Sequence, residues 1–301
     1  MNLDLFEDFL ELARELNFSR AAAKRNMTQP AFSRRIKSLE DVLQAPLVSR
    51  STRSVTLTPA GEALQGRAED IVRMIAETRQ DVQDAAGQSR RQLNLAVTHA
   101  LSYTFVPRWL MQVTGPAELG TLNMVSDTQR QSIRLLQAGE VNFLITHMGL
   151  DLPSGLSRRQ FNAIQIGEDR LVPVCVPLAD GSPRWCLGGE DPFPVLDYAE
   201  ASGLHAILKS YWAAHGRPGM TPIMSSVLAA TNLEMAKEGQ GVSFLPSSIA
   251  EPDLAAGHLV HAGDLKNEVP IRIMIFRSKA RLSRHSETFW QRVVENRESD
   301  L

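Results

Sequence analysis

The sequence predicts a protein in three parts: a small helical unit with a β-hairpin, one long helix, and a larger α/β region. Three observations predict this order. Apolar residues recur at helical spacing as far as Leu43, a seven-residue repeat runs from Leu64 to Ala85, and strand-like and helix-like segments alternate from residue 91 onward. At 301 residues, the chain is long enough for two domains of ordinary size.

Positive charge is concentrated near the N-terminus. Between Asn17 and Thr56 there are eight basic and two acidic side chains, a net charge of +6. Because the whole chain carries −2, the remaining residues together carry −8. This asymmetry predicts a polyanion-binding module attached to a part with another role.

Three short helices are expected before the first hairpin. Residues 3–16 form an amphipathic helix, Ser19 is the expected N-cap of the second helix, and Thr28 is the expected N-cap of the third, with Pro30 in its first turn. The third helix has a buried stripe of Phe32, Ile36, Leu39 and Leu43. Its opposite face presents Gln29, Ser33, Arg34 and Lys37.

Two short helices joined by a tight turn, the second with a polar basic face, indicate a helix-turn-helix. In the major groove arginine can bond guanine in bidentate fashion, glutamine can bond adenine, and serine can bond a base or a phosphate. A solvated basic face on an ordinary helical bundle is the alternative interpretation of this stretch.

The segment LVSRSTRSVTLTPAG, residues 47–61, predicts a short β-hairpin, which would be the wing of a winged helix-turn-helix. Arg50 and Arg53 would project from it toward phosphate or the minor groove, and Thr58 and Pro59 would open the next helix. We therefore assign a DNA-binding domain to residues 1–58. Its candidate DNA-binding residues are Ser19, Thr28, Gln29, Pro30, Ser33, Arg34, Lys37, Arg50 and Arg53.

Residues 59–88 are expected to form a long linker helix. Its heptad seam consists of Leu64, Ala68, Ile71, Ile75, Thr78, Val82 and Ala85. Because no other nearby segment offers an apolar face to bury this seam, we expect it to pair with a second copy of the chain; packing on its own domain is the alternative. Two recognition helices in one dimer would read double-stranded DNA with an interrupted inverted repeat.

Residues 1–60 resemble the N-terminus of the LysR-type transcriptional regulators. Many positions match in one register: Phe18, Ser19, Ala21, Ala22, Ala23, Gln29, Pro30, Ser33, Ile36, Leu39, Glu40, Leu47, Arg50, Thr56, Leu57, Thr58, Ala60 and Gly61. The resemblance implies a transcriptional regulator that dimerises through the linker helix, assembles as a homotetramer and responds to a small effector. RNA polymerase is a further candidate partner.

The remaining chain alternates strands and helices, which predicts a mainly parallel α/β sheet. Strands are expected at 91–97, 121–126, 141–147, 171–177, 221–226, 241–249 and 269–278, and helices at 101–113, 129–139, 203–215, 228–239 and 283–297. This part, residues 89–301, resembles the two-lobed effector domain of the same family, related in fold to periplasmic binding proteins. The resemblance implies a lobe one of residues 91–163 and 266–301 and a lobe two of residues 164–265.

Polar side chains follow several of these strands, where open α/β sheets bind ligands. The candidate effector-binding residues are Thr98, His99, Ser102, Thr128, Thr146, His147, Ser202, Ser225 and Ser226. Hydroxyls and helix N-termini there would suit an organic acid or another anion. Helix capping explains the serines and threonines equally well, and the two histidines are equally well explained as surface residues. His258 and His261 lack a nearby cysteine or acidic partner, so we expect no metal, and no motif indicates a cofactor.

The stretches THALSYTFVPRWL and FRSKARLSRHSETFWQRV of the effector half also resemble the hypochlorite-responsive branch of the family, in which methionine oxidation is the proposed signal. Here Met111, Met124, Met148, Met224 and Met235 sit at core-like positions, and Cys175 lies mid-strand as a buried, inert thiol. Oxidant sensing through methionine or cysteine therefore remains an alternative to effector binding.

Other classes of function leave weaker signals. The sequence has no nucleophile elbow, phosphate loop or H-E-x-x-H motif, so an enzyme with an appended helix-turn-helix is disfavoured; turnover of a ligand would revive it. A ligand-independent footprint would favour a DNA-architectural protein. The N-terminus lacks the basic region of a signal peptide, and no apolar run reaches the ~18–20 residues of a membrane span, so we expect a cytoplasmic protein without membrane partners.

Overall fold

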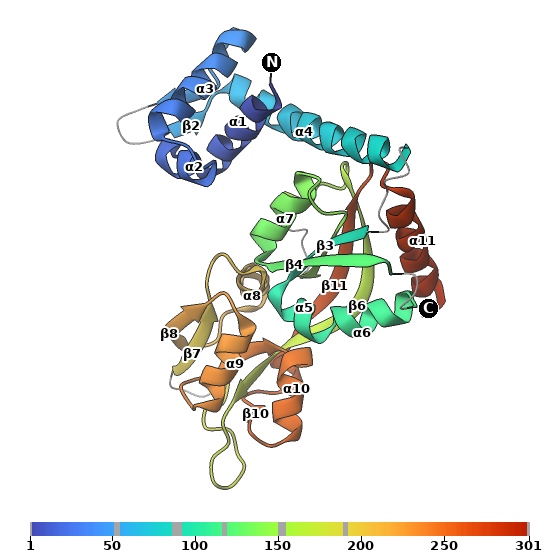
Figure 1. The fold of residues 1–301 in the computed structure, drawn as a ribbon. Helices are drawn as coiled ribbons and strands as arrows, with labels where there is room; N and C mark the ends of the chain where they lie inside the picture. Colours follow the sequence, from blue (N-terminus) through green and yellow to red (C-terminus); the bar gives the residue numbers. More distant parts are fainter. Residues whose placement is uncertain are drawn as a thin grey trace. The chain divides into compact units, whose positions relative to one another are not determined.

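The computed structural model describes residues 2–50, 55–85, 92–115, 119–149, 155–188 and 192–299 (Figure 1). The chain divides into two compact units. One comprises Met1–Gln88 with Gln137–Gly139, and the other comprises Ser89–Leu136 with Glu140–Leu301. No helix among the described residues is both long and apolar enough to cross a bilayer.

The first unit is a winged helix-turn-helix, as predicted. It contains α1 (Leu3–Glu15), α2 (Phe18–Lys24) and α3 (Gln29–Leu43), followed by the antiparallel pair β1 (Val48–Arg50) and β2 (Val55–Leu57). The predicted stripe of α3 is confirmed, because Phe32, Ile36 and Leu39 are fully buried.

The expected cap of α2 is wrong by two residues. The Arg20 amide donates a hydrogen bond of 3.0 Å to Asn17 Oδ1, so Asn17 is the N-cap and Ser19 lies exposed in the first turn. The helix starts earlier because Phe18 is buried, with its ring edge-on to Phe32 at 6.2 Å between centroids. Thr28 does occupy the N-cap position of α3, but its side chain makes no capping hydrogen bond.

The long helix α4 (Pro59–Ala85) starts at the predicted residue, whereas its predicted end at residue 88 lies outside the described residues. Its seam divides into two halves. Ala68 is fully buried in the core of the winged helix-turn-helix, and Leu64 and Ile71 pack against the same core. The expectation that no neighbouring segment buries the seam is therefore wrong for this half. Farther along, Ile75 and Val82 remain 43% and 63% exposed.

Lobe one of the second unit is built on three parallel strands. The order is β4 (Thr121–Asp127), β3 (Gln92–Thr98) and β5 (Phe143–Met148), with β3 in the middle. The helices of this lobe are α5 (His99–Thr104), α6 (Val106–Val113), α7 (Gln129–Gln137) and α11 (Arg284–Ser299). The single helix expected at 101–113 is two helices, because the chain turns at Phe105 and Pro107 then starts α6, where its missing N–H has no consequence.

Two long antiparallel strands connect the lobes. They are β6 (Phe161–Cys175) and β11 (Val269–Ser278), which pair along almost the whole length of β11. Each contributes to two cores: Ile164 and Ile273 pack in lobe one, whereas Leu171 and Ile271 pack in lobe two. Because β11 is antiparallel to both β5 and β6, the expected mainly parallel sheet is wrong, and the sheet is mixed.

Lobe two surrounds the far half of these strands. It contains β7 (Phe193–Tyr198), β8 (Met220–Ser226), β9 (Ser243–Pro246), β10 (Val260–His261), the helices α8 (Gly203–His215), α9 (Ala229–Lys237) and α10 (Ser247–Ala255), and a 3₁₀ turn at Leu265–Asn267. The strand expected at 241–249 ends at Pro246, where α10 begins. The strand β7 and the first half of β6 were not predicted from the sequence.

Candidate functional site

One face of α3 forms an exposed polar groove. Its walls are Gln29, Pro30, Ser33, Arg34, Lys37 and Glu40. Gln29, Arg34 and Lys37 are exposed, whereas the opposite face of the helix is the buried stripe. The helix therefore presents hydrogen-bond donors and positive charge in one direction, which is the arrangement that a recognition helix needs in a major groove.

The other predicted DNA-binding residues lie around this face or outside the described residues. Ser19 is exposed on α2 and Thr28 is exposed at the start of α3. Arg50 is the last residue of β1, and its side chain is not described. Arg53 lies outside the described residues.

Arg35 has a structural partner. Its Nε donates to the buried carboxylate of Asp8 on α1, and Arg25 donates to the other oxygen of the same carboxylate at 2.8 Å. Asp8 thereby ties α1 to the end of α2 and to α3. The sequence shows Arg34 and Arg35 only as neighbours, so their different roles follow from the fold.

Glu40 positions the wing relative to α3. Its Oε1 accepts hydrogen bonds from the backbone amides of Leu47 at 2.8 Å and Val48 at 3.3 Å, at the start of β1. Sequence reasoning noted Glu40 only as a match to the family pattern and missed this contact. No local signal could reveal it, since the partner amides lie seven and eight residues away.

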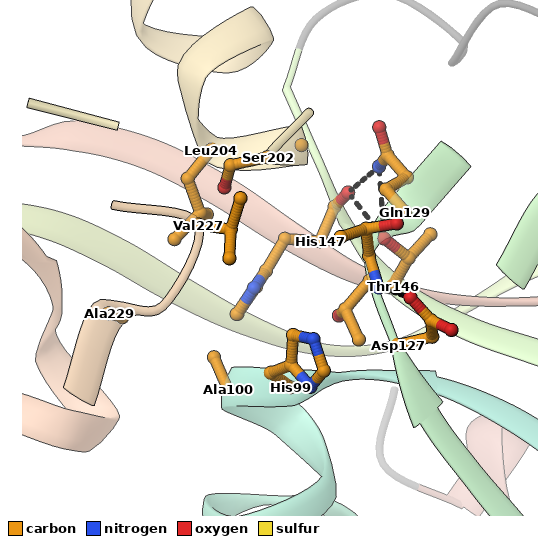
Figure 2. Close-up of a pocket in the computed structure, with 13 residues that line it drawn as sticks. His99, Ala100, Asp127, Gln129, Thr146, His147, Ser202, Leu204, Val227 and Ala229 are labelled. Carbon is orange, nitrogen blue, oxygen red and sulfur yellow. Dashed lines mark hydrogen bonds between the residues drawn. The ribbon is translucent and has the colours of Figure 1, made fainter. Parts of the chain in front are cut away.

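A second site lies between the two lobes of the effector half. It is a pocket of ≈ 390 Å³, open solvent included, with walls from both lobes. Lobe one contributes the ends of β3, β4 and β5, and lobe two contributes the starts of α8 and α9 (Figure 2). The part of it that the centre of a water-sized molecule can occupy is only ≈ 30 Å³, so in this structure it has room for a very small ligand.

Six of the nine predicted effector-binding residues line this pocket: Thr98, His99, Thr128, Thr146, His147 and Ser202. The other three are not among the lining residues. Ser102 Oγ donates to the His99 carbonyl at 2.8 Å, and Ser226 Oγ accepts from the Leu228 amide at 3.1 Å just before α9. Ser225 lies in β8 beside Asp197 of β7.

Several lining residues were missed from the sequence, above all Gln129. Its Nε2 donates to Thr146 Oγ1 at 3.0 Å and to the His147 carbonyl at 3.1 Å, which joins the start of α7 to the end of β5. Across the lobe boundary the same side chain lies against Gly203, where a Cβ would be 2.8 Å from the Gln129 carboxamide carbon. The lobe-two lining residues Gly203, Leu204, Val227 and Ala229 carry no polar side chain that could have indicated them.

Behind His147 lies Asp169 of β6, which the sequence reasoning also missed. The imidazole is 3% exposed, and its Nε2 is 3.6 Å from Asp169 Oδ2. The carboxylate accepts hydrogen bonds of 2.6 Å from both Ser247 and Ser248 at the start of α10. Burial opposes ionisation, but the imidazole and the hydroxyls outweigh it and hold the pKa of Asp169 well below its ordinary value.

This lowered pKa predicts how the effector half responds to acid. A carboxyl whose pKa is lower in the folded state stabilises the fold above its unfolded pKa of about 4, and this stabilisation is lost as the pH falls further. We expect Asp169→Asn to lower the free energy of unfolding by about 1–3 kcal/mol at pH 7, and by less at pH 3.5. Urea unfolding followed by tryptophan fluorescence measures both. An equal loss at the two pH values, or a similar pattern in Glu200→Gln, a variant of an exposed carboxyl in the same half, would contradict this assignment.

Other sequence expectations are settled by burial and contacts. Cys175 is fully buried, as predicted, and burial raises the pKa of its thiol.

Met111 and Met124 are 49% and 40% exposed, so their expected core positions are wrong; they lie on the outer faces of α6 and β4. His258 does have an acidic partner, Asp253, at 2.9 Å, although the described residues contain no group of three or more possible metal ligands.

The fold and the two sites define a winged helix-turn-helix protein with a two-lobed ligand-binding domain. The family described as "Bacterial regulatory helix-turn-helix protein, lysR family" matches residues 3–62, and "LysR substrate binding domain" matches residues 86–298. Together these matches cover nearly the whole chain. The chain belongs to the LysR family of transcriptional regulators, and the predicted family, fold class and DNA-binding regulatory role are confirmed; it is a regulator and not an enzyme.

Relatives match over most of their length. The chain is 24% identical to the HTH-type transcriptional regulator YjiE of Escherichia coli K12 (96% of this chain, 92% of the relative) and 30% identical to the glycine cleavage system transcriptional activator of the same organism (86% and 81%). Among solved structures, Vibrio fischeri DarR in complex with DNA is 27% identical with a TM-score of 0.56 (97% and 98%). Full-length HypT of Salmonella typhimurium, a hypochlorite-specific regulator, is 25% identical with a TM-score of 0.60 (100% and 99%).

Proposed function

We propose that this regulator reads an interrupted inverted repeat in double-stranded DNA through the exposed face of α3, under the control of a small effector bound between the two lobes. The polar groove of α3 carries the first part of this proposal. A fully buried stripe packs α3 against the core, and Arg35 of the same helix bonds Asp8. The exposed side chains of the groove therefore project from a rigid element.

We also propose that the chain dimerises through the second half of α4. Met74, Ile75 and Val82 expose large apolar side chains there, and Ile75 and Val82 are one heptad apart. A second copy of α4 would remove these side chains from water and hold two recognition helices at a fixed spacing, as an inverted repeat requires. From the family resemblance we further propose that the chain assembles as a homotetramer and that it contacts RNA polymerase.

Selection of bound fragments from a random DNA pool, with full-length protein at near-physiological salt, tests the proposal. We expect a shared motif with two inverted half-sites. Fragments that share no motif and dissociate as the salt concentration rises would show that the basic face binds phosphate alone, and the proposal of a specific site would fail.

Arg34 is the side chain of this face with the largest expected effect on sequence preference. On the selected site, Arg34→Ala should weaken binding by about 1–3 kcal/mol, because a bidentate contact to a base is lost. The matched variant Arg34→Lys keeps the charge and should retain affinity for random DNA while it loses discrimination. Titrations with the selected site and with a scrambled duplex measure both effects. If Arg34→Ala loses equal affinity on the two duplexes, Arg34 contacts phosphate only.

A further inference from the structure

One end of lobe one carries basic side chains that neither the α3 face nor the pocket between the lobes uses. Two segments supply them: residues 155–162, which lead into β6, and residues 277–286, which run from the end of β11 into α11. Together these segments contain six arginines and lysines and no aspartate or glutamate. The second segment lies in the stretch FRSKARLSRHSETFWQRV, to which neither site gives a role.

Strand pairing brings the two segments side by side. Phe161 pairs with Ser278 in the antiparallel register of β6 and β11, and the Lys279 amide donates to the Gln160 carbonyl at 2.9 Å. Arg284 follows Lys279 by only five residues, which is at most about 18 Å of extended chain. The exposed basic side chains of this end of the lobe, which we call the lobe-one basic patch, are Arg158, Arg159, Lys279, Arg281 and Arg284.

The charges of this patch have no counter-charges in the described part of the chain. The sixth basic residue of the two segments, Arg277, is buried and bonds both oxygens of Glu287, at 2.6 and 2.9 Å. None of the five patch residues forms an ion pair with another described residue. Cations that share one surface repel one another, and a bound polyanion would remove this repulsion.

The composition of the patch fits nucleic acid better than protein. Leu156 and Phe161 within these segments are buried, and none of the large apolar side chains exposed elsewhere on the described chain belongs to them. Protein interfaces are centred on apolar and aromatic anchors, whereas protein–DNA interfaces are polar and strongly positive. Arginine and lysine can bind phosphate oxygens without any requirement for base sequence. The patch therefore matches the DNA backbone.

The chain also places this patch within reach of DNA bound by α3. Leu95 of β3 pairs with Phe143, and Phe143 pairs with Arg277, so β3 begins at the same end of the sheet as the patch. The helix α4 is roughly 40 Å long, and the chain from Ala85 to Gln92 spans at most about 25 Å. This upper limit of about 65 Å corresponds to roughly 19 base pairs of duplex.

We propose that the lobe-one basic patch binds the phosphate backbone of DNA that flanks the half-sites. The effector half then contacts the duplex outside the sequence that α3 reads. This inference rests on the proposed DNA site, because the specific contact holds the flanking duplex near the patch. A tethered flank needs only weak phosphate contacts, since the second binding event is intramolecular. Each phosphate contact steepens the fall of log K with log salt by about 0.9.

The test compares two duplexes that carry the selected inverted repeat. One ends at the half-sites, and the other extends about 20 base pairs beyond each of them. Full-length protein is titrated on both at several salt concentrations. We expect the native protein to bind the long duplex roughly tenfold more tightly at about 0.1 M salt, with a slope steeper by about 2–4. The combined variant Arg158→Gln/Arg159→Gln/Lys279→Gln should keep its affinity for the short duplex and lose most of this gain.

Two further variants separate charge from structure. Arg158→Lys/Arg159→Lys retains the charges and should retain the gain from the flanks. The matched control Lys209→Gln/Arg217→Gln/Lys266→Gln removes three exposed charges from lobe two and should also retain it.

Three outcomes would overturn the inference. They are no gain from the flanks in the native protein, a gain that survives in the glutamine variant of the patch, and an equal loss of the gain in the lobe-two control. The first of these would direct attention to an acidic protein as the partner of the patch. The short duplex reports the half-site contacts alone, so failure of the proposed DNA site is distinguishable from failure of the patch.

Discussion

Asp8→Ala is expected to destabilise the DNA-binding unit by about 3 kcal/mol. Under conditions near the unfolding midpoint of this unit, the variant should lose specific DNA binding. The Asp8 side chain is completely buried, and its two oxygens bond Arg25 and Arg35. Removal of this carboxylate leaves Arg25 with Glu7 at 2.7 Å and Arg35 with Asp4 at 3.7 Å, and it breaks the link through which both arginines bond one buried group. We place the effect at the low end of the range for buried ion pairs because the two arginine side chains are 30% and 32% exposed, and water can replace part of the lost interaction.

Hydrogen exchange of the amides in α1, α2 and α3 measures this loss, with an expected fall in protection of roughly a hundredfold. All four tryptophans, Trp109, Trp185, Trp212 and Trp290, belong to the other unit, so an unchanged fluorescence transition shows that the effector half is intact. Asp41→Ala is the matched control. Its pair with Lys37 is exposed on both sides and should contribute at most about 1 kcal/mol. Similar losses in the two variants would refute the role assigned to Asp8.

Gly61→Ala is the second large effect, expected at about 3 kcal/mol through overpacking. A Cβ at Gly61 would overlap the carbonyl oxygen of Leu47 and lie 3.1 Å from its carbonyl carbon. This carbonyl cannot move away easily, because it accepts a hydrogen bond from the Thr58 amide at 3.0 Å while the Leu47 amide donates to Glu40. The substitution therefore strains the start of β1, and DNA binding should weaken together with stability.

Gly66→Ala on the same helix provides the control for Gly61→Ala. A Cβ at Gly66 would meet nothing within 4 Å, so alanine should stabilise α4 by about 0.5–1 kcal/mol through its better helix propensity. Circular dichroism during thermal unfolding, compared between the two variants, measures opposite shifts. A stabilisation by Gly61→Ala would show that helix propensity and not close packing decides the outcome there, and a destabilisation by Gly66→Ala would contradict the open space around Gly66.

The DNA-binding half was predictable because its signals are local. Helical spacing identified the buried face of α3, and the residues left on the other face included Gln29, Ser33, Arg34 and Lys37. The exact caps were less accessible, because Asn17 and Ser19 are both good N-cap residues and the burial of Phe18 decides between them. The role of the first half of α4 was also hidden, since a heptad seam has the same pattern whether it packs on its own domain or on a second chain.

The effector half was predictable at the level of strand ends. Six candidate residues at or after strand ends, or at a helix start, line the pocket, because the carboxyl ends of parallel strands meet at one edge of a sheet. Gln129 and Asp169 could not be found in this way. Gln129 acts through a partner at Thr146, and Asp169 lies in a strand whose alternation of polar and apolar residues indicates neither its burial nor its contact with His147.

The sequence by itself determined the order of the parts, the helix that we propose to read DNA and the kind of residues that surround the pocket, since these depend on periodicity and on spacing within single elements. Only the tertiary structure decided which charged side chains bond other residues of the chain and which are exposed to solvent. Arg34 and Arg35 are adjacent in sequence, yet one is exposed and the other bonds Asp8. Likewise His147 has Asp169 behind it because β5, β6 and β11 pair across segments more than a hundred residues apart. Such pairings bring together groups that no local pattern connects.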